Sequence, residues 1–376
     1  MNGRLHTLIV GAGPAGLAVA GSLRARGLTF ELLEKSRTLA EPWHNHYDSL
    51  YLHTDKRHSA LPGLPYPADY PRYITRVQFI EYLEVYAERF GINPRWEEEA
   101  VSAERAGDLW ELKTTSDMYL AHNLVIATGF TARPKLPDLP GLDTSPIPVV
   151  HSSDYHTALP YRGKRVLVVG FGNSAAEIAK DLYEGGAFPT LSVRSPVNIV
   201  PREFFGLVPL LSVSVLFSRV PAALADAASA PLISLQYRNL ESMGLRKAPY
   251  GPFVQVRKDG RIPLIDTGII SLMRKKRVPV RPGIARVDED LVVFDDGSNA
   301  RFDALIMATG YRPAAQEMFP QETDLFDESG LPRAFGGTSA SQGLYFCGFH
   351  VVASGMLREI SLEAEEIGDR IGTGVR

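Results

Sequence analysis

The feature that most constrains this chain is a pair of glycine-rich motifs, each directly after a short apolar run. Gly11-Ala-Gly13-Pro-Ala-Gly16 follows Thr7-Leu-Ile-Val10, and Gly170-Phe-Gly172-Asn-Ser-Ala175 follows Val166-Leu-Val-Val169. In a strand–turn–helix unit such glycines allow a tight turn and let the backbone approach a pyrophosphate at the helix N-terminus. We therefore predict two dinucleotide-binding units, although Ala175 replaces the third glycine of the second motif.

The second predicted strand of each unit ends in a residue of opposite charge. Phe30-Glu-Leu-Leu-Glu34 ends in a carboxylate and Thr190-Leu-Ser-Val-Arg194 in a guanidinium, each about 20 residues after its motif. The acid suits a ribose hydroxyl and repels a 2′-phosphate, which is typical of FAD or NAD and, at an N-terminal site, more often of FAD. Arg194, with Ser195 beside it, suits the 2′-phosphate of NADPH because a guanidinium offers a fork of donors.

Two further motifs repeat along the chain. Leu124-Val-Ile-Ala-Thr128-Gly129 and Leu305-Ile-Met-Ala-Thr309-Gly310 are near copies, and each is typical of a buried strand that ends in Ala-Thr-Gly. Small residues let a strand end abut a nucleotide or the neighbouring domain. The pair indicates an internal repeat of architecture, with one copy in each unit or at the crossings between them.

Composition restricts the class of protein. The 376 residues are enough for two domains, and 45% hydrophobic with 22% charged residues is typical of a globular protein. The net charge of −3 offers no basic face to nucleic acid. Cys347 is the single cysteine, so no disulfide forms within the chain. That composition, together with a start that leaves no room for a signal peptide, predicts a cytoplasmic protein.

We predict an α/β fold of two Rossmann-like three-layer domains, with the NADPH domain inserted into the FAD domain. The FAD domain is assigned to residues 1–145 plus 301–376, and the NADPH domain to residues 146–300. A helical insert is placed at 206–240. Its apolar part, 206–235, contains Arg219, Asp226 and three prolines, so we do not expect it to span a membrane. Ordinary buried helices are expected there, and the alternatives are short helices that cover the active site or a patch for a membrane surface or a dimer.

Local patterns predict individual elements within these domains. Residues 37–75 are expected to form irregular structure over the cofactor, and Thr75 to cap an amphipathic helix. Residues 96–125 alternate as a β-meander does, and Asp296-Gly297 suits a hairpin turn. The last helix is placed at residues 361–371.

Taken together, the motifs give the chain a resemblance to the class B flavin-dependent monooxygenases, most closely to their YUCCA-like branch. The resemblance extends from Gly11 to the last helix. It is carried by Leu50-Tyr-Leu-His-Thr-Asp-Lys56, Gln78-Phe-Ile-Glu-Tyr-Leu-Glu-Val-Tyr-Ala87, Gly163-Lys-Arg-Val-Leu-Val-Val-Gly170 with Gly172-Asn-Ser174, Val200-Pro-Arg-Glu203, Ala308-Thr-Gly-Tyr-Arg312 and Gly343-Leu-Tyr-Phe-Cys-Gly-Phe349.

The resemblance implies a reaction in which NADPH reduces FAD and molecular oxygen forms a flavin C4a-hydroperoxide. That species oxygenates a small organic substrate, either a 2-oxo acid such as indole-3-pyruvate or an amine, sulfide or ketone. The flavin carries the difficult chemistry and the protein supplies positioning. The implied partners are therefore a small molecule and oxygen, with no nucleic acid and no integral membrane segment, and the oligomeric state stays open.

The linker between the two nucleotide motifs departs from the family pattern. The family has Phe-x-Gly-x-x-x-His-x-x-x-aromatic, and the corresponding residues here are Ser145, Ile147, His151 and Tyr155. The His and the aromatic residue are kept, whereas the Phe and the Gly are not. In the family this linker couples domain movement to oxygen chemistry, so an NADPH oxidase that releases hydrogen peroxide is the alternative function.

The resemblance also implies site residues. His53 is the candidate catalytic residue, expected at the reactive edge of the flavin; the alternative is a histidine that packs and bonds to backbone. Trp43 is expected on or near the isoalloxazine ring, and Asn173 and Ser174 at the NADPH pyrophosphate and ribose. The other candidate cofactor-binding residues are Gly11, Ala12, Gly13, Pro14, Ala15, Gly16, Glu34, Lys35, Thr54, Val101, Ala127, Thr128, Gly129, Gly170, Gly172, Arg194, Ser195, Ala308, Thr309, Gly310 and Gly348.

Three other classes fit the sequence less well. A disulfide-type flavin reductase needs a Cys-x-x-Cys pair, which a chain with one cysteine does not have. A flavoprotein redox sensor would not need the NADPH-site Arg194. A metal site formed by His44, His46, His53 and His58 matches no zinc spacing and has no cysteine nearby, so no metal is expected.

Overall fold

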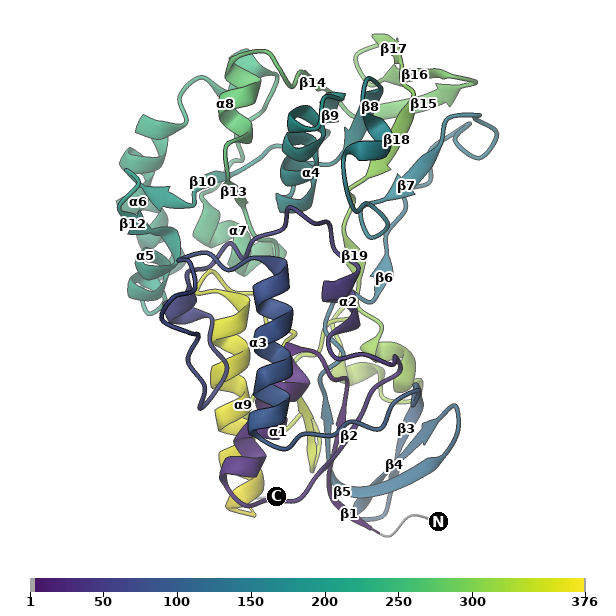
Figure 1. Cartoon of the computed structure of the whole chain (residues 1–376), viewed down its shortest axis with the longest axis vertical. Coiled ribbons are helices and arrows are strands. Elements are labelled where there is room, and N and C mark those ends of the chain that lie inside the picture. Colours follow the sequence, from purple (N-terminus) through teal and green to yellow (C-terminus); the bar gives the residue numbers. More distant parts are fainter. Residues whose placement is uncertain (1–3, 375–376) are drawn as a thin grey trace.

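The computed structural model describes residues 4–374, which form two lobes stacked along the long axis (Figure 1). The first lobe is built on a six-stranded sheet of order β2-β1-β5-β4-β3, with β20 also paired to β5. Strands β1, β2, β5 and β20 are parallel, and β3, β4 and β5 form the expected antiparallel meander. The strands are β1 (Leu5–Val10), β2 (Glu31–Leu33), β3 (Ala100–Ala106), β4 (Leu109–Thr114), β5 (Met118–Ile126) and β20 (Leu344–Phe346).

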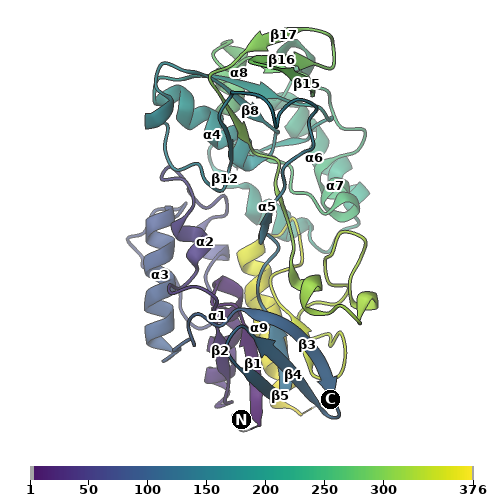
Figure 2. The ribbon, with the colours of Figure 1, turned by 90° about the vertical axis from the view of Figure 1, so that its right-hand side faces the viewer.

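Three helices pack together against this sheet: α1 (Pro14–Ala25), α3 (Arg76–Arg89) and α9 (Met356–Gly372). Figure 2 shows α1 and α9 beside the strands, with α3 on the outer side. Thr75 caps α3 through a reciprocal capping box with Gln78, as its position predicted. Helix α9 begins before the predicted residue 361 because Gly355, with φ of +93°, already ends the preceding loop.

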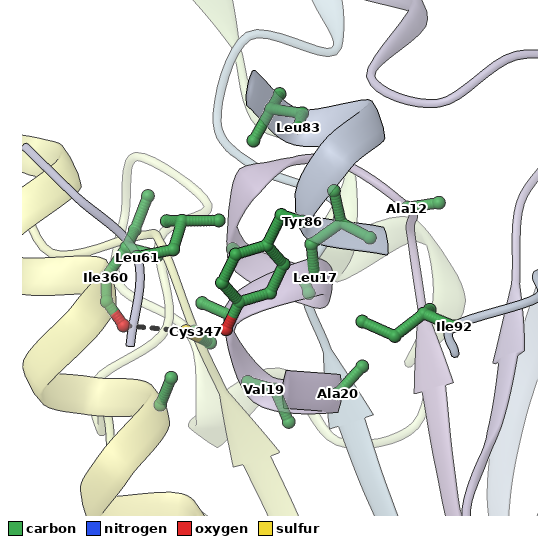
Figure 3. Packing of buried hydrophobic residues seen from close by; sticks show 14 of the residues in the cluster. Ala12, Leu17, Val19, Ala20, Leu61, Leu83, Tyr86, Ile92, Cys347 and Ile360 are labelled. Carbon is green, nitrogen blue, oxygen red and sulfur yellow. Dashed lines mark hydrogen bonds between the residues drawn. The ribbon is translucent and has the colours of Figure 1, made fainter. Parts of the chain in front are cut away.

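The core between these helices and the sheet holds the single cysteine. Figure 3 shows Tyr86, Leu17 and Cys347 in this core. Cys347 is fully buried, and its Sγ donates to the Ile360 carbonyl at 3.8 Å. Because burial raises the pKa of the Cys347 thiol well above its usual value, the residue behaves as a small apolar core residue.

The second lobe is built on a five-stranded parallel sheet of order β14-β9-β8-β18-β7. Helix α4 (Asn173–Glu184) connects its strands β8 and β9. A smaller antiparallel sheet follows, and Asp296-Gly297 joins its last two strands. The strands are β7 (Val149–His151), β8 (Arg165–Val169), β9 (Phe188–Ser192), β14 (Val280–Arg281), β15 (Ile284–Asp288), β16 (Leu291–Phe294), β17 (Asn299–Arg301) and β18 (Ala304–Met307).

The predicted domain boundary at residue 301 is wrong by one strand. Strand β18 is fully buried between β8 and β7 in the second sheet, so the chain leaves the second lobe only after Met307. An unbroken apolar run suits the centre of a parallel sheet, which is covered on both faces. The sequence alone did not show which of the two sheets this run would join.

The two chain crossings between the lobes are paired with each other. Strand β6 (Arg133–Pro134) runs antiparallel to β19 (Tyr311–Arg312), and Figure 1 shows both between the lobes. Lys135 N donates to the Gly310 carbonyl at 2.9 Å, and the Thr309 hydroxyl donates to the Lys135 carbonyl. These hydrogen bonds tie both crossings into one connection.

The segment between β9 and β14 contains four α-helices, of which α5 and α7 lie near the first lobe and α8 lies at the far end of the second lobe (Figure 2). Asp226 of α6 accepts hydrogen bonds from Phe253 N and Val254 N in the first turn of α7, at 2.8 and 3.0 Å. Within residues 4–374, no helix combines the length and apolar content needed to cross a membrane. The elements are β10 (Ile199–Pro201), β11 (Glu203–Phe204), β12 (Val208–Pro209), α5 (Leu210–Phe217), α6 (Ala222–Gln236), α7 (Pro252–Asp259), β13 (Leu264–Asp266) and α8 (Ile269–Arg274), with α2 (Glu41–His44) in the first lobe.

Candidate active site

The middle glycine of each motif is the N-cap of the following helix. Gly13 precedes α1 and Gly172 precedes α4, and neither has a side chain that could occupy the free N–H groups of the first turn. A Cβ built at either glycine meets no described atom within 4 Å. Each helix therefore presents open backbone at its N-terminus, which fits a pyrophosphate.

The first glycine of each motif explains the duplicated Ala-Thr-Gly sequences. Gly11 has φ of +103°, and a Cβ there would lie 2.8 Å from the Ala127 carbonyl oxygen. Gly170 has φ of +125°, and a Cβ there would lie 2.4 Å from the Ala308 carbonyl oxygen. The strand end in each lobe thus abuts its own glycine turn, and only glycine fits this approach.

Glu34 fastens the first motif. Its carboxylate accepts hydrogen bonds from Ala12 N at 2.7 Å and Ser36 N at 3.0 Å, with the side chain almost buried at the edge of the cavity. The Ala12 N–H is therefore occupied within the protein. A Cβ at Gly16 would lie 1.8 Å from the Gly11 carbonyl oxygen, so Gly16 serves the close packing of helix on turn.

A cavity of about 1270 Å³ extends between the two lobes. It contains most of the residues proposed for the flavin: Gly11, Gly13, Pro14, Ala15, Glu34, Lys35, Trp43, His53, Thr54, Val101, Ala127, Thr128, Gly129 and Gly348, together with Asn173 of the second lobe. Trp43 contacts Phe79 edge-to-face, with 4.4 Å between ring centroids. The fold thus brings these dispersed sequence positions to one cavity.

Another part of the cavity lining comes from residues that follow β10, and the sequence indicated only some of it. It is apolar and comes from β11 and the helices α5, α6 and α7, with Phe204, Leu211, Ile233, Phe253 and Val256 among its residues. The signal for it was the apolar segment 206–235, for which helices over the active site were one alternative to ordinary buried helices. These residues make up an apolar part of the cavity, which we call the apolar chamber, and the same cavity is lined by the residues proposed for the flavin.

The residues proposed for NADPH lie mostly outside this cavity. Gly170, Gly172, Ser174, Ala308, Thr309 and Gly310 belong to the turns at the carboxyl end of the second sheet, and Arg194 and Ser195 are exposed just after β9. Arg246, which the sequence did not indicate, donates from its guanidinium to the Arg194 carbonyl. Asn173 Oδ1 accepts from Ile265 N at 2.8 Å, so this side chain also ties α4 to β13.

His53 is held by a carboxylate that the sequence did not indicate. Its Nε2 lies 2.6 Å from Glu177 Oε1, and Tyr47 donates its hydroxyl to Glu177 Oε2 at 2.5 Å. Glu177 follows Asn173 by one helical turn on α4, so both face the same side of the helix. The partner of His53 is thus a carboxylate of the other lobe.

The linker residues have defined contacts. His151 Nε2 lies 3.1 Å from the Gly310 carbonyl, and Tyr155 donates to Asp181 at 2.5 Å. Where the family pattern has Phe and Gly, Ser145 donates to the Glu289 carbonyl and Ile147 is buried in the core of the second lobe. Among residues 4–374 no group of three or more His, Cys, Asp or Glu side chains is arranged to hold a metal ion.

A buried acid supports the cavity at Gly348. Glu363 Oε2 accepts from Gly348 N at 2.7 Å, whereas Oε1 finds no hydrogen-bond partner among the described residues. Burial raises the pKa of Glu363 to about 7. The folded state therefore holds this proton at pH values where the unfolded chain has released it, and the stability contributed by the group falls as pH rises from about 4.5 to 7.

We expect Glu363→Gln to stabilise the protein at pH 8 by up to about 3 kcal/mol, with little effect at pH 5. The amide keeps an oxygen for Gly348 N–H and cannot ionise. Thermal unfolding at both pH values, at equal added cofactor, measures the difference. An equal change at pH 5 and pH 8 would show that ionisation of Glu363 is not the cause.

The chain is similar in sequence to known proteins over most of its length. Residues 8–200 match the family model of the pyridine nucleotide-disulphide oxidoreductases. The probable indole-3-pyruvate monooxygenase YUCCA3 of Arabidopsis thaliana is 38% identical over 91% of this chain and 81% of its own length. The indole-3-pyruvate monooxygenase YUCCA1 of Oryza sativa subsp. japonica is 37% identical over 91% of this chain and 86% of its own.

Solved structures share the fold at lower identity. The flavin-containing monooxygenase from Stenotrophomonas maltophilia superposes with a TM-score of 0.76 at 21% identity, covering 100% of both chains. Open cyclohexanone monooxygenase gives 0.75 at 19% identity, covering 99% of this chain and 88% of that chain. These two structures therefore share the overall fold of this chain.

Proposed function

This chain belongs to the flavin-dependent monooxygenases, in their YUCCA-like branch, and on that premise we propose that it oxidatively decarboxylates a 2-oxo acid of the indole-3-pyruvate kind. As a member, it is an oxidoreductase that uses a flavin and a nicotinamide cofactor. We propose FAD in the first lobe and NADPH in the second, so that the NADPH domain interrupts the FAD domain. When bound, the flavin supplies the redox and oxygen chemistry.

The protein's own residues suit these two cofactors. The open N-terminus of α1 at Gly13 fits the FAD pyrophosphate, and Glu34 keeps acceptor capacity for a ribose hydroxyl beside its two backbone donors. In the second lobe, Gly172 leaves the N-terminus of α4 open, and the exposed Arg194 suits a 2′-phosphate. In this proposal each lobe has one helix N-terminus for a pyrophosphate and one charged residue that recognises the ribose hydroxyl or its 2′-phosphate.

The apolar chamber is the observation that carries the substrate proposal. Its residues, which include Leu211, Ile233 and Phe253, offer an aromatic ring an apolar environment in the same cavity that Trp43 and His53 line. Two relatives that match 91% of this chain are named as acting on indole-3-pyruvate, which carries such a ring. The 2-oxo acid group would then face the residues proposed for the flavin.

The test is turnover of indole-3-pyruvate by the purified protein with FAD, NADPH and oxygen. We expect the corresponding acetic acid, carbon dioxide, NADP⁺ and water in equimolar amounts, with each NADPH and each oxygen molecule consumed once. A ketone, a sulfide and an amine run in parallel test the other substrate classes of the family.

The same assay decides the alternative. NADPH consumption that yields equimolar hydrogen peroxide with every substrate would establish an oxidase, which the Ser145 and Ile147 positions of the linker favour. A bound flavin that NADPH does not reduce would establish a redox sensor instead.

A further inference from the structure

Glu177 joins the two lobes through both of its carboxylate oxygens. Oε1 lies 2.6 Å from His53 Nε2, and Oε2 accepts from the Tyr47 hydroxyl at 2.5 Å. The side chains of Glu177 and His53 are 11% and 21% exposed, so water competes little for the contact. Glu177 belongs to α4 of the second lobe, whereas Tyr47 and His53 belong to the segment that lines the cavity from the first lobe.

That segment, residues 44–53, is anchored from both lobes. Arg76 of α3 donates to the His44 and His46 carbonyls at 2.6 and 2.9 Å. From the other side, Tyr47 and Leu50 are part of the hydrophobic core that α4 shares with the second sheet. The position of His53 therefore depends on α4 as well as on the lobe to which its own segment belongs.

The hydrogen bonds at Glu177 indicate that His53 Nε2 is the ring nitrogen that carries a proton. Burial, followed by the neighbouring Glu177 charge, raises the pKa of Tyr47 well above its usual value, so the Tyr47 hydroxyl stays a donor. An ionised carboxylate only accepts hydrogen bonds, so the contact with Oε1 requires a proton on His53 Nε2. In the neutral ring Nδ1 is then the acceptor, which makes the free side of the imidazole well defined.

We propose that Glu177 is a positioning residue for the oxygenation reaction, because it holds His53 in one ring orientation and one tautomer at the cavity wall. This inference rests on the proposed function, which puts the reactive edge of the flavin beside His53. Glu177 itself acts through His53. Its contact also makes the geometry of His53 dependent on the placement of the nicotinamide-binding lobe.

The first experiment reads the His53 ring directly, without turnover. Nitrogen NMR of protein labelled with ¹⁵N-histidine, with His53→Asn used to assign the signal, reports which ring nitrogen carries the proton. We expect the Nε2-protonated form in the wild-type protein and in Glu177→Gln, whose amide oxygen still accepts from Nε2. In Glu177→Ala we expect averaged tautomers. A His53 signal unchanged by the alanine variant would overturn the proposal, whatever the substrate turns out to be.

The second experiment measures product and peroxide formed per NADPH. We expect Glu177→Ala to lower product per NADPH at least about fivefold with a matching rise in peroxide, while the KM for NADPH and the flavin content change less than twofold. Because residues that act through one another are not additive, the Glu177→Ala/His53→Ala double variant should resemble His53→Ala alone. Glu177→Gln should restore most of the coupling.

Glu184 provides the matched control, since it is an exposed acid on the same helix, paired with Lys180 at 3.7 Å. Glu184→Ala should leave coupling unchanged. If the losses of coupling caused by Glu177→Ala and His53→Ala multiply in the double variant, the proposed role of Glu177 is overturned. It is also overturned if Glu177→Gln impairs coupling as much as Glu177→Ala. If the alanine variant does not fold, the ¹⁵N signal of the wild-type protein still decides, because a His53 protonated on Nδ1 instead of Nε2 would overturn the proposal.

Discussion

The Gly13→Val variant is expected to fold and to purify without flavin. A Cβ at Gly13 meets no described atom within 4 Å, and the backbone there is extended, so the protein itself has room for the side chain. The added methyl groups instead occupy the approach to the N-terminus of α1, where the pyrophosphate must lie. A rigid obstruction of this kind costs about 3 kcal/mol or more, which weakens flavin binding by at least about 100-fold.

The ratio of flavin absorbance to protein absorbance measures this loss, and far-ultraviolet circular dichroism verifies the fold. Gly11→Val gives a useful contrast, because Gly11 has φ of +103° and its Cβ would lie 2.8 Å from the Ala127 carbonyl oxygen. That variant should lose the fold together with the flavin. A yellow Gly13→Val protein with wild-type flavin content would show that the flavin does not bind at the N-terminus of α1 in the first lobe.

The reciprocal variant, Gly172→Val, is the matched control. Gly172 has the same open backbone geometry at the start of α4. This variant should retain its flavin, and dithionite should still reduce it, whereas NADPH at ordinary concentrations should not. Loss of flavin from both variants would mean that the two cradles do not serve separate cofactors.

Local patterns were enough to predict the parts of the fold that are encoded within one strand–turn–helix unit. The spacing from Gly11 to Glu34 is set by one helix and one strand, α1 and β2, so the sequence predicted this carboxylate at the glycine turn, where the structure has it. The capping box at Thr75 and the meander of β3 to β5 are likewise local. In each case the residues that decide the structure are close in sequence.

Contacts between distant segments had no such signature. Glu177 and His53 are 124 positions apart, and neither lies in a pattern that predicts the other. The apolar chamber is similar, because the segment 206–235 could bury its side chains against many surfaces. Strand β18 has the composition of a central parallel strand, and this does not specify which sheet it enters. These features depend on tertiary packing, which a single sequence does not reveal.

Arg194→Ala is expected to raise the KM for NADPH by about 10- to 100-fold while changing that for NADH less than about twofold. Hydrogen bonds from a guanidinium to a phosphate contribute about 1.5–3 kcal/mol, and NADH has no 2′-phosphate to lose them. Arg194 is exposed directly after β9, and its Cβ lies close to Gly283, so truncation removes the guanidinium without opening the core. Anaerobic flavin reduction by each nucleotide measures binding separately from oxygen chemistry.

Two further variants sharpen the assignment of Arg194. Arg194→Lys keeps the charge and loses the fork of donors, so its effect on NADPH should fall between the wild-type and alanine values. Arg286, an exposed arginine of the same lobe that is paired with Asp288, serves as the control, and Arg286→Ala should leave both KM values unchanged. If Arg194→Ala raises the KM for NADPH and for NADH equally, Arg194 does not bind the 2′-phosphate. The neighbouring Arg246, whose guanidinium contacts the Arg194 carbonyl, would then be the next cation to replace.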